Sequence, residues 1–332
     1  MRRVLVTGGA GFIGSHLVEA LLERGCHVTA VDDESTGRFA NLAAVREHPR
    51  LTCAAGSIAN TELLDRLVAD ADEVYHLAAA VGVALVARQP IETIERNIFP
   101  TDRLLSALRA RRRRGEDVRF FLASTSEVYG KNPKPVWNED DDLVFGPTTR
   151  MRWSYGASKA IDEFLALASW RQDGLPVVIG RFFNVVGRRQ SGAYGMVLPR
   201  FIEAACAGRP LVVHDDGSQT RCFAHVSDVV RAVLALMESP EARGRVFNIG
   251  SDEPISILEL ARRVIAAAGS DSPIEHQTYA AAFDANFEDI RHRVPDLTRL
   301  RTTIEYIRRY DLDRIIADLV AASPRNSFTA EP

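Results

Sequence analysis

Short apolar runs alternate with longer amphipathic stretches through the first half of the chain. Runs such as "RRVLVTG", "EVYHLAA" and "VRFFLAS" predict strands that are buried on both faces. The stretches between such runs, at residues 13–24, 61–69, 91–113 and 156–172, carry apolar residues at helical spacing. This alternation predicts an α/β protein in which helices cover both faces of a parallel sheet.

The pattern changes after residue 181, where the segments become shorter and richer in glycine, proline and charge. We therefore predict two domains. The first covers residues 1–181, and residues 215–250 return to it. The second is a smaller, mixed α/β domain made of residues 182–214 and 251–325, and we expect it to bind the substrate.

The composition gives no indication of a nucleic-acid or membrane partner. The chain has 332 residues, 46% of them hydrophobic, and its 41 basic and 44 acidic residues give a formal net charge of −3. That balance gives no bulk signal for binding to nucleic acid or to a membrane surface. The basic run from Arg111 to Arg114 follows an amphipathic stretch, so we interpret it as a helix C-terminus. The longest apolar stretch, "LAAAVGVALVA", is too short to span a membrane.

Two rare residue types carry further information. The four cysteines are widely separated and include no C-x-x-C pair, so we predict no disulfide framework and no metal site. A reducing cytoplasm is therefore the expected location.

Among the 41 basic residues only Lys131, Lys134 and Lys159 are lysines. In a chain that otherwise uses arginine, each lysine suggests a specific role.

A glycine-rich segment follows the first predicted strand and opens the first predicted helix. In "VTGGAGFIGSH" it contains G-x-G-x-x-G, which also reads as G-x-x-G-x-x-G from Gly8. Such glycines allow a tight turn, and the helix N-terminus presents amide groups to a pyrophosphate. The second strand ends at Asp32, about 20 residues further on, where a carboxylate can bind ribose hydroxyls and disfavours a 2′-phosphate. We therefore predict a Rossmann-type doubly wound sheet that binds NAD rather than NADP.

A tyrosine and a lysine stand four residues apart at the start of a predicted helix. They are Tyr155 and Lys159 in "WSYGASKAIDEF". A tyrosine with an ordinary pKa near ~10 is a poor base at neutral pH, and an ammonium one turn away is expected to lower that pKa. The phenolate could then take a proton from a substrate hydroxyl while a hydride leaves for the nicotinamide. The alternative is an exposed pair on a surface helix, and the upstream fingerprint argues against it.

Four segments, "TGGAGFIG", "HLAA", "STSEVYG" and "YGASK", occur in the order and spacing of extended short-chain dehydrogenases/reductases. The chain resembles, more narrowly, the NAD-dependent nucleotide-sugar epimerases, dehydratases and decarboxylases. The resemblance implies a UDP-sugar substrate and a homodimer formed through helices 91–113 and 156–172. The NAD-binding positions that it implies are Gly8, Gly11, Phe12, Ile13, Gly14, Asp32, Leu77, Ala78, Ala79, Asn97, Tyr155 and Lys159.

A carboxylate closes the apolar run "VRFFLASTSEVYG", and its burial costs free energy unless the group is paired or used. By resemblance, these enzymes first oxidise the sugar 4-hydroxyl to a ketone and differ in how that ketone then reacts. The 4,6-dehydratases carry an adjacent Asp-Glu pair here, whereas this chain has Ser126 before Glu127. The segment "TSEVYG" resembles instead the UDP-glucuronate decarboxylases. That resemblance implies Thr125 at the sugar 4-oxygen, with Ser126 and Glu127 stabilising an enolate and returning its proton.

A second segment points to the same group. "FEDIRHRVPDL" resembles the basic-x-Pro segment of the decarboxylases and has Arg293 in the place of their active-site arginine. A guanidinium there could bind the substrate carboxylate bidentately. Substrate contacts are also implied at Asn184, Arg221 and Arg88, whereas Arg188 and Arg189 are either substrate contacts or surface charges.

Three hypotheses arise from these features. The leading one is a UDP-glucuronate decarboxylase, a lyase that gives UDP-xylose or, if the ketone is released first, a UDP-4-keto-pentose. The second is a UDP-sugar 4-epimerase that acts on UDP-glucose or UDP-glucuronate. It gains support if Glu127 only caps a turn or pairs with an arginine, and if Arg293 lies outside the pocket. The third, a dinucleotide-binding regulator without catalysis, is disfavoured because Tyr155 and Lys159 are intact.

Overall fold

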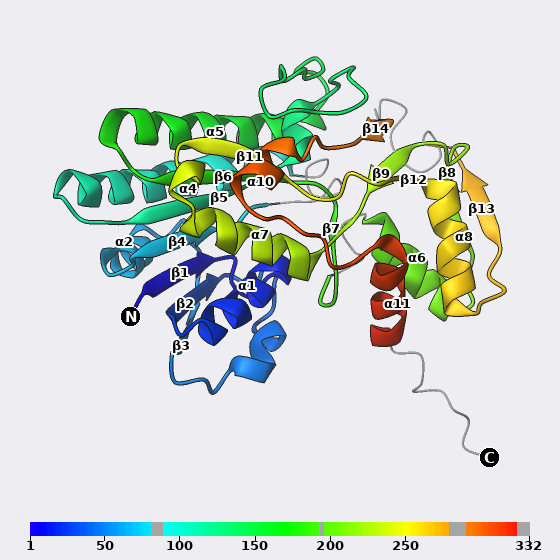
Figure 1. Ribbon diagram of the computed structural model, residues 1–332, viewed down its shortest axis with the longest axis horizontal. Coiled ribbons are helices and arrows are strands. Elements are labelled where there is room, and N and C mark those ends of the chain that lie inside the picture. Colours follow the sequence, from blue (N-terminus) through cyan, green and yellow to red (C-terminus); the bar gives the residue numbers. More distant parts are fainter. Residues whose placement is uncertain (81–88, 191, 193–195, 279–289, 324–332) are drawn as a thin grey trace.

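A parallel sheet forms the centre of the protein in the computed structural model, which describes residues 1–80, 89–190, 192, 196–278 and 290–323 (Figure 1). Its strands are β1 (Arg3–Thr7), β2 (His27–Asp32), β3 (Leu51–Ala55), β4 (Glu73–His76), β5 (Arg119–Thr125), β6 (Val177–Phe182) and β11 (Arg245–Ile249). The strand order is β11-β6-β5-β4-β1-β2-β3, and all neighbours are parallel. The predicted Rossmann-type sheet is therefore confirmed.

The direction of the strand order reverses between β1 and β4. From β1 the chain adds strands on one side as far as β3, and from β4 it adds them on the other side. Ligands of such sheets bind in the crevice at the carboxyl ends of the strands on either side of this reversal. The residues at those ends are Thr7 of β1 and His76 of β4, which start the glycine and "HLAA" segments. The next strand, β5, ends at Thr125, the second residue of the "STSEVYG" segment.

Helices cover both faces of the sheet because side chains along a strand alternate between the faces. Val4 and Val6 of β1 pack into one apolar cluster with two helices, and Leu5 packs into another cluster with three. The helices are α1 (Phe12–Glu23) and α7 (Val226–Glu238) on the first face, and α2 (Thr61–Ala69), α4 (Pro90–Arg113) and α5 (Trp153–Asp173) on the second.

A smaller region with its own apolar cluster lies to the right of the sheet in Figure 1. Short strands in it form the groups β12-β9-β14, β13-β8 and β10-β7. The division of the chain into an NAD-binding and a sugar-binding domain stays a prediction. The remaining elements of the described chain are η1 (Phe39–Val45), η2 (Ser126–Tyr129), β7 (Val185–Val186), α6 (Val197–Cys206), β8 (Leu211–His214), β9 (Thr220–Cys222), β10 (Ala224–His225), η4 (Pro240–Ala242), β12 (Pro254–Ser256), α8 (Ile257–Ala268), β13 (Ile274–Gln277), β14 (His292–Arg293), α10 (Thr298–Thr303) and α11 (Leu312–Ala322).

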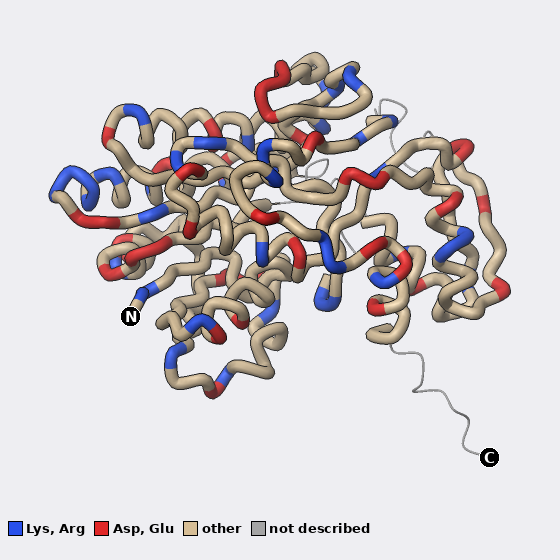
Figure 2. The backbone as a smooth tube through the Cα atoms, viewed as in Figure 1, with Lys and Arg blue, Asp and Glu red and all other residues tan. Residues whose placement is uncertain are grey.

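Charged residues of both signs are interspersed along the chain (Figure 2). The arginine run ends α4, as the sequence predicts. Its first member, Arg111, is buried and donates hydrogen bonds to the carbonyl oxygens of Val68 (2.7 Å) and Ala71 (2.5 Å). Arg114 at the end of the run pairs with Glu116. Among the described residues, no helix is long and apolar enough to cross a membrane, and no cluster of three or more His, Cys, Asp or Glu could hold a metal ion.

One buried amide ties three distant segments to the edge of the sheet. Asn248 of β11 accepts a hydrogen bond from the Tyr129 hydroxyl (2.7 Å). Its Nδ2 donates to the carbonyl oxygens of Trp137 (2.8 Å) and Asp296 (3.2 Å). Tyr129 lies just after Glu127, and Asp296 lies just after Arg293. Asn248 therefore holds both segments against the same strand.

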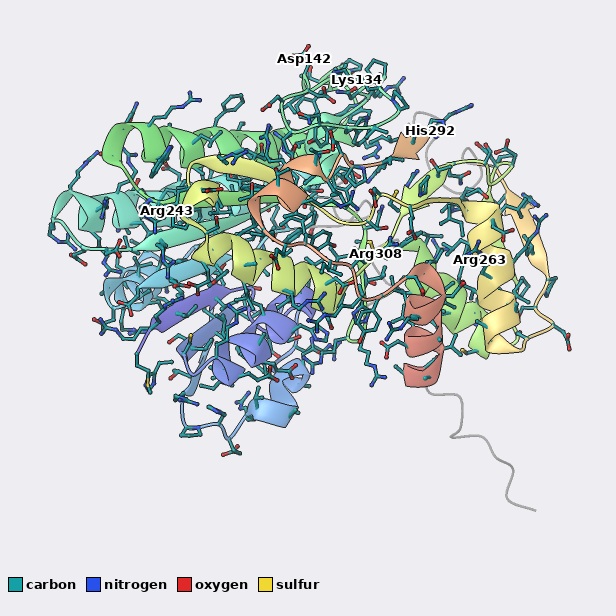
Figure 3. All side chains as sticks on the ribbon, viewed as in Figure 1. Lys134, Asp142, Arg243, Arg263, His292 and Arg308 are labelled. Atoms are coloured by element: carbon teal, nitrogen blue, oxygen red, sulfur yellow. The ribbon has the colours of Figure 1, made fainter. Side chains whose placement is uncertain are left out.

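The loop after η2 also pairs directly with the segment that follows β14. Figure 3 shows Lys134 and Asp142 on this loop and His292 on β14. The amide of Trp137 donates to the carbonyl oxygen of Val294 (2.9 Å), and Trp137 is fully buried in an apolar cluster beneath the loop. The chain thus brings residues near 127 and near 293 to one place.

We expect Asn248→Ala to lower the free energy of unfolding by about 2–3 kcal/mol, because it strands a buried hydroxyl and two carbonyl groups. Urea unfolding followed by circular dichroism measures this loss. Asn60→Ala is the matched control, since Asn60 only caps α2 through the Leu63 amide and should cost about 1 kcal/mol. An Asn248 variant no less stable than the Asn60 variant would contradict this role.

Candidate active site

The glycine segment forms a tight turn between β1 and α1. Gly8 has a φ of +69°, and a Cβ there would lie 2.8 Å from the amide nitrogen of Ala78. A Cβ at Gly14 would lie 2.0 Å from the carbonyl oxygen of Gly8, so only glycine fits at both positions. The turn leaves the N-terminus of α1, with Gly11 as its N-cap and Phe12 as its first residue, facing the crevice where an anionic group is favoured.

Asp32 ends β2 beside this turn and is buried. Its Oδ2 accepts a hydrogen bond from the amide of Ala10 (3.0 Å), and its Oδ1 accepts one from the amide of Glu34 (2.8 Å). Burial raises the pKa of Asp32, and these two hydrogen bonds oppose the shift. The carboxylate is therefore fixed next to the glycine turn, where the fingerprint requires it.

The residues after β4 pack directly against the start of the turn. The amide of Leu77 donates to the carbonyl oxygen of Thr7 (3.1 Å), and the amide of Ala78 donates to the Thr7 hydroxyl (3.2 Å). Asn97 of α4 accepts a hydrogen bond from the amide of Ala80 (2.8 Å). The other positions of the predicted NAD site lie on the same segments, with Ile13 on α1 and Ala79 between Ala78 and Ala80.

Tyr155 and Lys159 lie in the first two turns of α5, as predicted. Burial raises the pKa of Tyr155, and the nearby carboxylates of Glu127 and Asp162 raise it further, whereas a hydrogen bond with Thr125 opposes the shift. The pKa of Tyr155 in the protein as it stands therefore lies above its ordinary value, not below it as the sequence suggested. The physical reason is that burial, which disfavours the phenolate, is the largest influence, and the charges of Glu127 and Asp162 add to it. The effect of Lys159, whose ammonium pairs with Asp162 at 2.9 Å, stays a prediction.

Thr125 and Ser126 join β5 to η2. The Thr125 hydroxyl caps η2 by accepting a hydrogen bond from the amide of Glu127 (3.2 Å). Ser126 is buried. Thr125 therefore links Tyr155 to the segment that carries Glu127.

Glu127 lies between two arginines. Its Oε1 is 2.5 Å from Nη2 of Arg293, and its Oε2 accepts a hydrogen bond from Nη1 of Arg152 (2.8 Å). All three side chains are at most 15% exposed. Burial alone would raise the pKa of Glu127, but the charges of Arg293 and Arg152 outweigh burial and lower that pKa to about 2. The pairing of Glu127 with arginines meets one of the two conditions that favour the 4-epimerase hypothesis. The other condition, Arg293 outside the site, is not met, because Arg293 binds the carboxylate whose charge raises the pKa of Tyr155.

Two of the predicted substrate contacts, Arg221 and Asn184, lie at β9. Arg221 of β9 is the register partner of Arg293 on β14, and its Nη1 donates to the carbonyl oxygen of Thr220 (2.9 Å). Asn184 has a φ of +26° and donates to the carbonyl oxygen of Cys222 (3.0 Å). Arg88 lies outside the described residues.

Arg188 and Arg189 make ion pairs at the edges of two helices. Arg188 pairs with Asp318 of α11 (2.7 Å), and Arg189 pairs with Glu19 of α1 (2.6 Å). Of the two interpretations left open for these arginines, these contacts favour surface charges that join the C-terminal helix and α1 to the intervening loop.

Sequence reasoning missed two residues of the site, Arg152 and Asp162. Arg152 immediately precedes α5, and in an arginine-rich chain its residue type carried no contrast. Asp162 carried a usable signal, because a residue three positions after Lys159 lies on the same face of the helix.

Comparison with known proteins points to the same class of enzyme. The sequence matches the model of the NAD dependent epimerase/dehydratase family over residues 4–250. A UDP-N-acetyl-alpha-D-glucosaminuronate decarboxylase of Bacillus cytotoxicus is 41% identical over 311 residues, which are 92% of this chain and 92% of that protein. A UDP-glucuronic acid decarboxylase 1 of Arabidopsis thaliana is 32% identical over 322 residues, which are 95% of this chain and 69% of that protein.

Solved structures give the same result for the fold. A UDP-glucuronic acid 4-epimerase from Bacillus cereus, in complex with UDP-glucuronic acid and NAD, has a TM-score of 0.85 and 28% identity, with 96% of this chain and 98% of that chain covered. A dTDP-glucose 4,6-dehydratase from Bacillus anthracis in complex with NAD has a TM-score of 0.84 and 24% identity, with 98% and 97% covered, and shows the same fold. The chain therefore belongs to the NAD dependent epimerase/dehydratase family of enzymes, with NAD as its cofactor.

Proposed function

We propose that the protein is an NAD-dependent decarboxylase of a UDP-linked hexuronate. The observation that carries the proposal is the pairing of Glu127 with Arg293 and Arg152 beside Tyr155. One carboxylate between two guanidinium groups leaves a net positive charge in the site, which suits a carboxylate on the substrate. A 4-epimerase of UDP-glucose needs no such charge at sugar carbon 5, whereas a 4-epimerase of UDP-glucuronate also binds a carboxylate there, so the charge favours a uronate substrate and the NMR test below separates the two reactions.

The residues present fit NAD. A Cβ at Gly14 would collide with the backbone of the turn, and one at Gly8 would collide with the backbone of Ala78, so glycines keep the turn tight at the N-terminus of α1, where a pyrophosphate would bind. Asp32 is fixed where ribose hydroxyls would bind. NAD, when bound, supplies the acceptor for a hydride from sugar carbon 4. Tyr155 exchanges the proton of the 4-hydroxyl, with Thr125 hydrogen-bonded beside it.

Oxidation at carbon 4 turns a hexuronate into a β-keto acid. The bond between carbons 5 and 6 then breaks, carbon dioxide leaves, and the electron pair passes to the oxygen on carbon 4 as an enolate. Arg293 and Arg152 hold the substrate carboxylate before this step, and their charges favour the enolate after it. A proton added at carbon 5 restores the ketone.

Glu127 is ionised at neutral pH in the protein as it stands, so it carries no proton to give. A substrate carboxylate that shares Arg152 and Arg293 would raise the pKa of Glu127, because two like charges then compete for the same partners. Glu127 could then take up a proton from solvent and pass it, with the neighbouring Ser126 hydroxyl, to carbon 5. The carboxylate and the hydroxyl thus share the role that the sequence suggested for them.

The sugar carries either a hydroxyl or an acetamido group on carbon 2. The relative with 41% identity over 92% of both chains bears the name of a UDP-N-acetylglucosaminuronate decarboxylase, whereas UDP-glucuronic acid decarboxylases share 32–34% identity. We therefore take UDP-N-acetylglucosaminuronate as the preferred substrate. UDP-glucuronate, the substrate expected from the sequence, with UDP-xylose or a UDP-4-keto-pentose as product, is the second candidate.

The test is to incubate the protein with NAD and either uronate and to follow the sugar by proton NMR. We expect pentose signals to replace those of the uronate, faster with the acetamido sugar.

Arg293→Lys should lower kcat at least ~100-fold, because a lysine cannot keep the bidentate geometry. Arg291→Lys, two residues earlier and exposed, is the matched control and should leave kcat unchanged. A 4-epimer that keeps carbon 6 would show that the protein is an epimerase, like the Bacillus cereus enzyme whose structure contains UDP-glucuronic acid.

The ion pairs of Glu127 also predict a pH dependence of stability. Because folding lowers the pKa of Glu127 from 4.5 to about 2, this group stabilises the folded state above pH 4.5, and the contribution of about 3 kcal/mol is lost as the pH falls to about 2. Glu127→Gln removes that contribution. Urea unfolding at a series of pH values should therefore show a weaker loss of stability with acid in the variant than in the wild type. Parallel curves for the two proteins would refute the ion-pair account.

We further propose that the protein forms a homodimer through α4 and α5. Phe99 of α4 and Phe164 of α5 are 64% and 69% exposed, and Ile161 lies one turn before Phe164 on α5. Large apolar side chains that are exposed together on two packed helices are typical of an interface.

Phe99→Glu combined with Phe164→Glu should give a monomer in size-exclusion chromatography with light scattering. Ile307→Glu, at an equally exposed position elsewhere, should leave the dimer intact, and a wild-type monomer would contradict the proposal.

A further inference from the structure

The side chain of Lys159 is only 2% exposed, although it carries a charge. Its Nζ lies 2.9 Å from Oδ2 of Asp162, whose side chain is fully buried. Tyr155, Lys159 and Asp162 follow one another at spacings of four and three residues, so they form a single stripe along α5. A phenol, an ammonium and a carboxylate thus stand in a row along one buried helix face.

Other elements that pack here offer Lys159 no second counter-charge within the described residues. From β4, His76 is hydrogen-bonded to Thr7 (2.7 Å) and Thr101 (2.9 Å), and burial together with the charge of Lys159 lowers the pKa of His76 to about 3. His76 is therefore neutral. Thr101, from α4, is uncharged and lowers the pKa of Asp162.

The nearby carboxylates are already paired with other groups. Glu163, next to Asp162 on α5, is bound by Arg181 (2.7 Å) and accepts a hydrogen bond from Ser124 (2.5 Å). Glu127, from η2, is bound by two arginines. Burial, and the charge of Glu163 to a smaller extent, raise the pKa of Asp162, while Lys159 opposes the shift. Lys159 and Asp162 therefore depend on each other to remain charged.

We propose that Asp162 is a positioning residue that keeps Lys159 protonated and fixed beside Tyr155. A buried ammonium without a counter-charge is costly and tends to lose its proton. An ammonium has three N–H donors, and Asp162 takes one of them. Two donors remain for the ribose hydroxyls of the cofactor and for the phenolate of Tyr155. A neutral amine would still have two N–H groups, but it would carry no positive charge to stabilise the phenolate.

The test uses the scarcity of lysine in this chain. With isotope-labelled lysine, the NMR spectrum of the full-length protein contains signals from only Lys131, Lys134 and Lys159, and their chemical shifts report protonation directly. In Asp162→Asn we expect Lys159 to lose its proton more than about one pH unit below the wild-type value, with Lys131 and Lys134 unchanged. The measurement requires neither substrate nor cofactor, so its result does not depend on the proposed function. Only the catalytic role of Lys159 rests on the proposed function.

Glu163→Gln is the matched control, because it removes the adjacent buried carboxylate on the same helix, which pairs with Arg181. It should lower stability and leave the Lys159 titration in place. Asp162→Glu keeps the charge and should restore the wild-type titration. In the decarboxylation assay, Asp162→Asn should lower kcat at least ~10-fold at high pH and move the alkaline limb of the pH profile towards neutral pH. An unchanged Lys159 titration in Asp162→Asn would overturn the proposal.

Should Asp162→Asn fail to fold, the double variant Lys159→Met, Asp162→Asn decides the question. Methionine has no charge, so the buried counter-charge is no longer needed. We expect the double variant to fold and to unfold at a higher urea concentration than Asp162→Asn alone. A double variant that also fails to fold would overturn the proposal, because Asp162 would then be required for a reason other than Lys159.

Discussion

A buried charge must have an opposite charge beside it, and this constraint organises the active site. Glu127 lies between Arg152 and Arg293, and Lys159 pairs with Asp162. Lys159 and Asp162 lie on the same helix, whereas Arg293 reaches Glu127 from a separate strand. In both cases the packing of other elements buries the charges, and burial is what makes an unpaired charge so costly. The site is thus a set of charges whose positions are determined by one another, at the carboxyl ends of strands that supply the rigid support.

The support reaches residues that are far apart in the chain. Glu127 lies two residues after β5, whereas Arg293 lies on the two-residue strand β14, which is outside the central sheet. Asn248 joins the two by hydrogen bonds to Tyr129 and Asp296. Its position at the edge strand β11 explains why the last strand of the sheet matters for chemistry that takes place beside β5.

The sequence predicted the repeated, local features well. Alternating apolar and amphipathic segments gave the sheet and its helices, and the glycine spacing with Asp32 gave the turn beside α1. Long-range charge pairing was beyond such reasoning. Glu127 and Arg293 were each identified, but nothing in the sequence placed them 2.5 Å apart, and Arg152 could not be distinguished from the many surface arginines. The direction of the Tyr155 pKa was misjudged because it depends mainly on burial and then on the charge of Glu127, and the packed structure is needed to see both effects.

The position of Arg293 in the chain separates two parts of the proposed reaction. The family model matches residues 4–250, so the glycine turn, Tyr155 and Lys159 lie inside the matched region, while Arg293 lies beyond it, on a two-residue strand that pairs with β9. The groups that serve the oxidation at carbon 4 and the guanidinium that we propose to act on the resulting ketone therefore come from different parts of the chain. Substitutions around Arg293 would then alter the fate of the ketone while the sheet and the cofactor turn stay as they are.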